Sequence, residues 1–208
     1  RRAVVALGGE HVVAGWGADD VLVVMGGPMG VADLGRPEYP WLAPVAALLR
    51  QRLARGWPNI GVCLGMQLMA HAAGAKVAPM TDASGARVRE VGWGPLALVG
   101  QDALLRGLPA SLEVLHWHGD ACALPAGAEL LASTEACPVQ MFRLGRSVGM
   151  QFHPEIDGPT ACLWAEEDAE FVRAANGEDG VGRLRAASPS AAARSHRWRR
   201  ELLGRVVR

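Results

Sequence analysis

The sequence predicts an α/β protein, a three-layer sandwich in which helices flank a mostly parallel central sheet with a small antiparallel portion. Strand-like and helical segments alternate over residues 21–74, which is typical of parallel βα units. Short strand-like runs follow over residues 87–152, and 26 glycines and 13 prolines among 208 residues supply the turns between elements. Half of the residues are hydrophobic, which is enough to bury a sizeable core.

The alternating region is expected to hold two strands and two helices. The apolar run Val21–Met25 stops at a Gly-Gly-Pro sequence, as a buried strand does when it enters a loop. Apolar residues recur every three or four positions from Leu42 to Leu53, which predicts a helix closed by Gly56. A second strand is expected over Asn59–Val62 and a second helix over Leu64–Ala73.

The middle block is expected to add short and mostly antiparallel strands, because its apolar runs are separated by Gly or Pro turns. These runs are Arg87–Val91, Leu96–Val99, Leu112–Leu115, Glu129–Ala132, Val139–Arg143 and Ser147–Phe152.

The last part of the sequence returns to helical periodicity. A helix is expected from Thr160 to the Asn176-Gly177 stop signal. Residues 180–193 are small and polar and predict a loop or linker. Ser188-Pro189 is a plausible start for the last helix, in which Trp198, Leu202 and Val206 repeat every four residues. We therefore predict one main domain over residues 1–175, and a linker with a C-terminal amphipathic helix over residues 176–208.

Charge and cysteine usage exclude several classes of protein. The 21 basic and 21 acidic residues give a formal charge of zero, so neither nucleic acid nor a membrane is expected as a partner. No apolar run approaches the roughly 18 residues of a membrane helix. The four cysteines form no C-x-x-C pair, which disfavours a zinc site and a disulfide framework, so a reducing, cytoplasmic setting is expected.

Cys63 is the first candidate for chemistry. It stands between a predicted strand and a predicted helix, with Gly61 and Gly65 as its second neighbours. A tight strand-to-helix turn needs such small residues, and a helix N-terminus favours the nucleophilic thiolate. From this stretch alone, a buried structural cysteine is an equally good interpretation.

His153 and Glu155 are the second candidate, within the sequence Gln151-Phe152-His153-Pro154-Glu155. A cysteine nucleophile needs a base, and that base needs an acceptor that orients its other ring nitrogen. Residues two apart in an extended chain point to the same side, so Glu155 is placed to hold the imidazole of His153.

The loop Gly26–Gly30 lacks the spacing of a phosphate-binding loop. It suits backbone N–H donation to an oxyanion, although a plain turn explains it nearly as well.

Four motifs in this order and spacing resemble the class I (triad-type) glutamine amidotransferase domain over about residues 20–157. They are GGPMG at Gly26–Gly30, GVCLGMQLMA at Gly61–Ala70, HWHGD at His116–Asp120 and QFHPE at Gln151–Glu155. The stretch Glu90–Trp93 and the paired histidines resemble the stand-alone, GMP-synthase-like branch.

The resemblance implies a flavodoxin-like class I glutamine amidotransferase fold and a Cys-His-Glu triad. Cys63 would attack the glutamine side-chain amide, His153 would move protons and Glu155 would orient it. The backbone N–H groups of Gly27 and Leu64 would form the oxyanion hole. The residues implied in substrate binding are Gln67, Trp117, His118, Gly119 and Asp120.

The resemblance requires no cofactor and no metal. His116 and His118 with Asp120 give too few ligands to hold a metal by themselves. The expected partners are glutamine or a γ-glutamyl small molecule, and a separate synthetase subunit is a further candidate. Trp41, Trp93 and Trp164 are expected as core anchors.

The sequence departs from the family at its start, because only about 25 residues precede the GGP loop. Residues Arg1–Val13 offer one or two short strands, so we expect one N-terminal βα unit to be missing. Two alternatives to a glutaminase stay open: a γ-glutamyl amide hydrolase with the same triad, and an inactive truncated module with a regulatory or binding role.

Overall fold

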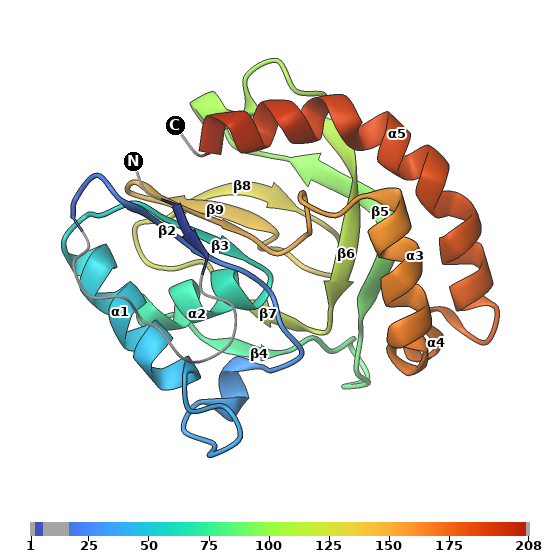
Figure 1. Ribbon diagram of the computed structural model, residues 1–208, viewed down its shortest axis with the longest axis horizontal. Coiled ribbons are helices and arrows are strands. Elements are labelled where there is room, and N and C mark those ends of the chain that lie inside the picture. Colours follow the sequence, from blue (N-terminus) through green and yellow to red (C-terminus); the bar gives the residue numbers. More distant parts are fainter. Residues whose placement is uncertain (1–2, 6–16, 207–208) are drawn as a thin grey trace.

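The computed structural model describes residues 3–5 and 17–206, and one eight-stranded sheet organises them (Figure 1). Its strands lie in the order β1-β2-β3-β10-β9-β8-β5-β6. Their bounds are β1 Ala3–Val5, β2 Val21–Val24, β3 Asn59–Val62, β5 Glu90–Leu98, β6 Ser111–His118, β8 Glu129–Ser133, β9 Met141–Leu144 and β10 Ser147–Met150. A separate two-stranded ribbon pairs β4 (Val77–Pro79) with β7 (Asp120–Cys122).

The sheet has a parallel half and an antiparallel half. Strands β1, β2, β3 and β10 run parallel to one another, and β10, β9, β8, β5 and β6 pair antiparallel in turn. The α/β class is confirmed, with four strands in each half of a single sheet. In the parallel half, β3 and β10 are fully buried and lie side by side, so their carboxyl ends open at the same edge.

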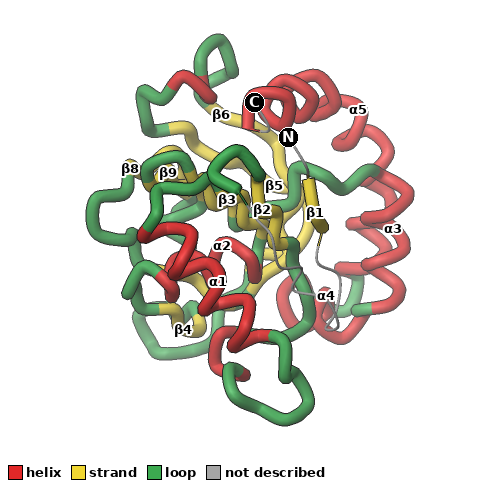
Figure 2. The backbone as a smooth tube through the Cα atoms, turned by 60° about the vertical axis from the view of Figure 1, so that its left-hand side comes forward, coloured by secondary structure: helices red, strands yellow, loops and turns green. Residues whose placement is uncertain are grey.

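Helices cover both faces of this sheet (Figure 2). On one face, α1 (Leu42–Ala54) and α2 (Leu64–Ala72) pack with β2 around the fully buried side chains of Leu49, Met66 and Met69. Both helices match their expected ranges closely. Short 3-10 turns occupy Val31–Asp33 (η1) and Ala103–Leu105 (η2).

The opposite face is covered by α3 (Gly158–Glu167), α4 (Ala169–Asn176) and α5 (Gly180–Val206). Trp198 and Leu202 of α5 are buried against the sheet, as the four-residue repeat predicted. Among the described helices, none combines the length and apolar character needed to cross a bilayer.

The linker expected over residues 180–193 is wrong, because α5 runs through it without a break. Pro189 lies inside the helix, and the carbonyl of Arg185 that it leaves without a helical N–H accepts a hydrogen bond from the Cys162 thiol, at 3.7 Å. The small residues serve packing: a Cβ on Gly158 of α3 would lie 3.1 Å from the carbonyl of Ser188.

Two further expectations about elements need correction. The single helix expected from Thr160 to Asn176 is divided at Asp168, whose ψ of 39° ends α3 and precedes α4. The two runs expected at 87–91 and 96–99 form one strand, β5, because the residues between them pair with β6 throughout.

At the start of the chain, β1 is one strand within the expected range, and it pairs parallel with β2. The rest of the expectation about the N-terminal βα unit falls on residues 1–2 and 6–16, which lie outside the described residues.

Candidate active site

Cys63 lies in a strained turn between β3 and α2. Its φ of 53° and ψ of −112° make it the only non-glycine with a positive φ in the described part of the chain. A Cβ on Gly61 would lie 2.6 Å from the backbone of Gly65, and one on Gly65 would overlap the carbonyl of Val24. Both glycines are therefore required by the close packing of this turn, as the sequence predicted.

The catalytic candidates come together because their strands are neighbours. The backbone N–H of Cys63 donates to the carbonyl of Met150 at 2.7 Å, which extends the pairing of β3 with β10. Three residues later, the N–H of His153 donates to the carbonyl of Leu115 on β6 at 2.9 Å. Cys63 and His153 are thus fixed at one edge of the sheet by backbone hydrogen bonds.

His153 lies between a sulfur and a carboxylate. Its Nδ1 is 2.7 Å from Oε1 of Glu155, and its ring lines the same pocket as Cys63. The ring of Trp164 meets the imidazole edge to face at a centroid distance of 5.0 Å. This arrangement brings together the three residues that the sequence singled out as a triad.

The electrostatics favour a charged imidazole. Burial by itself lowers the pKa of His153, but the hydrogen bonds and charges of Cys63 and Glu155 outweigh it and raise the pKa to about 10. An imidazolium beside the sulfur is the counter-ion that a nucleophilic thiolate needs.

The Gly26–Gly30 loop packs directly against these groups. A Cβ on Gly26 would lie 3.2 Å from Cε1 of His153 and 3.3 Å from Cβ of Cys63, so a side chain here would press on the triad. Gly27 borders the sulfur together with Leu64, the first residue of α2. Their assignment as the oxyanion hole stays a prediction.

The segment Trp117–Asp120 forms the opposite wall. The carbonyl of Trp117 lies 3.7 Å from Sγ of Cys63, and its indole N–H donates to Asp168 at 3.0 Å. Gln67 donates from Nε2 to the carbonyl of Asp120 at 3.2 Å and to Oε1 of Gln151 at 3.1 Å. The substrate roles of these residues and of Gly119 remain predictions, but all except Gln151 border the sulfur or its pockets.

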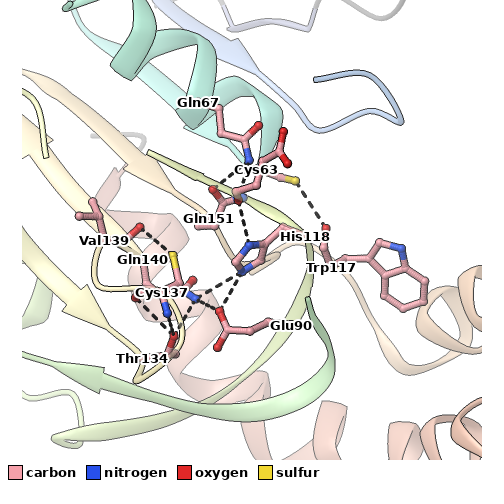
Figure 3. A network of polar contacts seen from close by, with 11 residues as sticks. Cys63, Gln67, Glu90, Trp117, His118, Thr134, Cys137, Val139, Gln140 and Gln151 are labelled. Atoms are coloured by element: carbon pink, nitrogen blue, oxygen red, sulfur yellow. Dashed lines mark hydrogen bonds and ion pairs between the residues drawn. The ribbon is translucent and has the colours of Figure 1, made fainter. Parts of the chain in front are cut away.

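Sequence reasoning missed a polar network behind this wall (Figure 3). His118 is buried, with Nδ1 3.1 Å from the carbonyl of Asp120 and Nε2 3.1 Å from Oε2 of Glu90. Gln140 donates to the same Glu90 oxygen at 2.6 Å. Gln140 lies in no motif, and the stretch Glu90–Trp93 indicated only a branch of the family. The contact of both residues with His118 follows from strand pairing.

The same network contains a group with metal-ligand chemistry. Within residues 3–5 and 17–206, the ligand atoms of Glu90, His116 and His118 lie within 4.8 Å of one another. Burial lowers the pKa of His116 to about 4, so that ring is neutral. Hydrogen bonds to Glu90 and to the Asp120 carbonyl already occupy both nitrogens of His118, which accounts for this residue as part of the wall.

Two pockets meet at Cys63. One, here called the Arg87 pocket, has a volume of about 490 Å³ and includes Gln67, Asp120 and Asp33. The other, here called the Trp164 pocket, has a volume of about 560 Å³ and includes His153 and Glu155. Trp164 was expected as a core anchor; it is half-buried and lines the second pocket.

The other cysteines lie in different surroundings. Cys122 and Cys137 are buried, and burial raises the pKa of each thiol to about 12. Cys162 is half-buried on α3, where its thiol contacts α5. Cys63 differs from them in lining an open pocket together with His153.

Comparisons with known proteins point to one family. The family model described as "Glutamine amidotransferase class-I" matches residues 11–161. The chain is 36% identical over 137 residues to a protein of Thermomicrobium roseum named GMP synthase [glutamine-hydrolyzing]. The match covers 65% of this chain but only 23% of that protein.

Solved structures resemble the fold as well. A crystal structure of a glutamine amidotransferase from Thermotoga maritima superposes with a TM-score of 0.77 and 29% identity, over 90% of this chain and 77% of that one. A structure described as a putative GMP synthase subunit, from Thermoplasma acidophilum, gives a TM-score of 0.54 at 27% identity, over 66% of this chain and 64% of that one.

Proposed function

The chain belongs to the class-I glutamine amidotransferase family, and from that premise we propose that it hydrolyses the side-chain amide of glutamine through a thioester on Cys63. The observation that carries the proposal is that one buried histidine hydrogen-bonds Glu155 and lines the same pocket as Cys63. That arrangement supports nucleophilic attack by sulfur with proton transfer by the imidazole.

In the first half of the reaction, the Cys63 thiolate attacks the carboxamide carbon. The N–H groups of Gly27 and Leu64 stabilise the oxyanion, with the start of α2 adding its dipole. The imidazolium of His153 then gives its proton to the departing nitrogen, the C–N bond breaks, and a glutamyl thioester remains on Cys63.

In the second half, His153 changes from acid to base. Acylation removes the negative charge of Cys63, which is among the causes that raise the pKa of His153. Burial, which lowers that pKa, is then opposed by Glu155 alone among those causes, so the ring becomes a base for water. Water attacks the thioester carbonyl, glutamate leaves and the thiolate returns.

The destination of the ammonia belongs to the same proposal. We infer that it passes to an acceptor held by a separate synthetase subunit. Support comes from the names of two relatives, a glutamine-hydrolysing GMP synthase and a putative GMP synthase subunit. The chain spans about a quarter of the first of these proteins, so the amination step itself lies on other residues.

The test is glutamate release from glutamine by wild type, Cys63→Ala and Cys162→Ser. We expect Cys63→Ala to lose at least about 10⁴-fold in kcat/KM, because it removes the nucleophile. Cys162→Ser keeps a donor for the Arg185 carbonyl and should stay close to wild type. If the wild type released no glutamate, and a glutamine-analogue electrophile such as a diazo-ketone amino acid did not label Cys63, the regulatory or binding module would be favoured instead.

A γ-glutamyl amide hydrolase with the same triad is the second candidate. The Trp164 pocket favours it, since that pocket is far larger than an ammonia molecule.

A further inference from the structure

Each of the two pockets beside Cys63 is placed to hold one part of a bound substrate. Both are lined by Cys63, Gly27 and Trp117, so they open on the same sulfur from different sides. An amide whose carbonyl carbon lies over Sγ therefore extends its acyl part into one pocket and its nitrogen substituent into the other.

His153 identifies which pocket receives which part. It lines the Trp164 pocket and is absent from the lining of the Arg87 pocket. Because His153 protonates the departing nitrogen, the leaving amine lies on its side, in the Trp164 pocket. The glutamyl part then lies in the Arg87 pocket, where Arg87 suits a carboxylate and Asp33 suits an ammonium.

The size of the Trp164 pocket indicates more than ammonia. Its volume is about 560 Å³, whereas a molecule of the size of water occupies about 30 Å³ in the liquid. Ammonia, which is similar in size to water, would leave most of this space to solvent. An alkyl chain of several carbons fits the pocket.

The lining indicates the charge of that chain. Trp117 and Trp164 meet edge to face at 5.5 Å and offer the aromatic surfaces that ammonium groups favour. Glu167 and Asp168 add two carboxylates, and no Lys or Arg is among the lining residues. Within the described residues, neither carboxylate forms an ion pair.

The position of Asp168 follows from the break between α3 and α4. Its backbone leaves the helical region there, and Oδ2 accepts the hydrogen bond from the Trp117 indole. Glu155 also lines this pocket, and its Oε2 is buried and has no hydrogen-bond partner. Three acidic residues thus line the Trp164 pocket.

We propose that the Trp164 pocket is a leaving-group site for cationic alkylamines, so that this chain cleaves γ-glutamyl amides of aliphatic diamines. The inference rests on the proposed function, since the same triad performs the reaction. The C–N bond breaks and a C–S bond forms, with the His153 proton going to the departing nitrogen. This first step releases the diamine. Water then supplies hydroxide to the acyl carbon and a proton to His153, and the C–S bond breaks, which releases glutamate and returns the Cys63 thiolate.

The test compares kcat/KM for four substrates: glutamine and the γ-glutamyl amides of diaminobutane, n-pentylamine and aminobutyric acid. The pentyl amide matches the diaminobutane amide in length but lacks its charge. We expect the diaminobutane amide to react at least about tenfold faster than either of the other substituted amides, and at least as fast as glutamine. Raised salt should shrink this preference, because Glu167 and Asp168 are exposed.

Variants assign the preference to the pocket. Glu167→Gln is expected to reduce the ratio of kcat/KM between the diaminobutane and pentyl amides by about fivefold to tenfold, the size of a partly screened charge interaction. Glu166→Gln is the matched control. Glu166 is the neighbour of Glu167 and is also exposed, but it pairs with Arg185 and does not line the pocket.

The outcomes separate the two proposals. Glutamine cleavage with no preference for the charged amide, or a preference that Glu167→Gln leaves unchanged, overturns the leaving-group site alone. Failure to cleave any of the four substrates overturns the proposed function, and the leaving-group site with it.

Discussion

At the scale of single residues, His153 depends on its two neighbours for its charge. Burial opposes protonation, and Cys63 and Glu155 reverse that effect and raise the pKa to about 10. We predict that NMR titration of wild type finds this imidazole protonated up to about pH 10. Cys63→Ala should lower that pKa, because it removes the hydrogen bond and the charge of the sulfur. A wild-type titration near the ordinary value of 6.5 would contradict this account.

Glu90 acts on the site through His118. Burial would raise the pKa of Glu90, but hydrogen bonding, first of all with His118, lowers it overall, so the group stays anionic. Its charge orients the ring that holds the Asp120 carbonyl.

We predict that Glu90→Gln lowers kcat/KM for glutamine by about tenfold to a hundredfold, mainly through KM, as the Trp117–Asp120 wall loosens. Glu113→Gln is the control, since Glu113 pairs with Arg194 at the surface. Unchanged kinetics in Glu90→Gln would show that the wall does not need this carboxylate.

The triad and its elbow could be predicted from sequence, while the network behind them could not. Cys63, His153 and Glu155 lie in local patterns whose geometry follows from a turn and an extended triplet. Glu90 meets His118 only through the register of β5 with β6, and Trp164 reaches His153 only through the packing of α3. Such contacts depend on the whole fold and leave no signal at one position.

At the scale of elements, α5 shows how composition misleads. Small residues and Ser188-Pro189 are typical of a linker, but in α5 they permit close contact with α3. Ser188 accepts a hydrogen bond from the Trp93 indole at 3.0 Å and donates to the carbonyl of Leu184 at 2.8 Å. Tertiary packing thus overrides the local propensity.

We predict opposite effects of two substitutions in α5. Ala191 is fully buried, so Ala191→Leu should reduce the free energy of unfolding by about 1–3 kcal/mol through overpacking. A Cβ on Gly182 meets nothing within 4 Å, so Gly182→Ala should raise it by about 0.5–1 kcal/mol through helix propensity. Urea unfolding measures both changes in the free energy of unfolding. If both changes were close to zero, this part of α5 would behave as a linker.

At the scale of the whole molecule, the two halves of the sheet contribute different parts of the site. The parallel half brings the ends of β3 and β10 together and so carries Cys63 and His153. The antiparallel half supplies the wall and the network that holds it. Alternating strands and helices predicted the first half well. The strand pairing in the antiparallel half depends on long-range contacts that the sequence pattern does not contain.

One ion pair joins β9 of the antiparallel half to η2. Arg143 of β9 binds Asp102 in a two-point contact, with Nη2 to Oδ1 at 2.9 Å, and Asp102 also caps η2. The hydrogen bond from Arg143 lowers the pKa of Asp102 below its usual 3.8. The stabilisation that this ion pair gives is present above about pH 4, and it is lost as the pH falls through the pKa of Asp102 in the folded state.

We predict that Asp102→Asn is about 1–3 kcal/mol less stable than wild type at neutral pH, and that the difference shrinks below about pH 4. Chemical unfolding across this range checks it, with the exposed Glu135→Gln as control. A stability difference between Asp102→Asn and wild type that does not change with pH would mean that the lost stability does not come from the charge of Asp102.

The most direct test of the central claim is to trap the acyl-enzyme. Protein mixed with glutamine, quenched in acid and examined by intact-protein and peptide mass spectrometry should carry one glutamyl group on Cys63. Glu155→Gln should change the amount that accumulates, and Cys63→Ala should carry none. Absence of the adduct in wild type, together with glutamine hydrolysis that persists in Cys63→Ala, would contradict the assignment of Cys63 as the nucleophile.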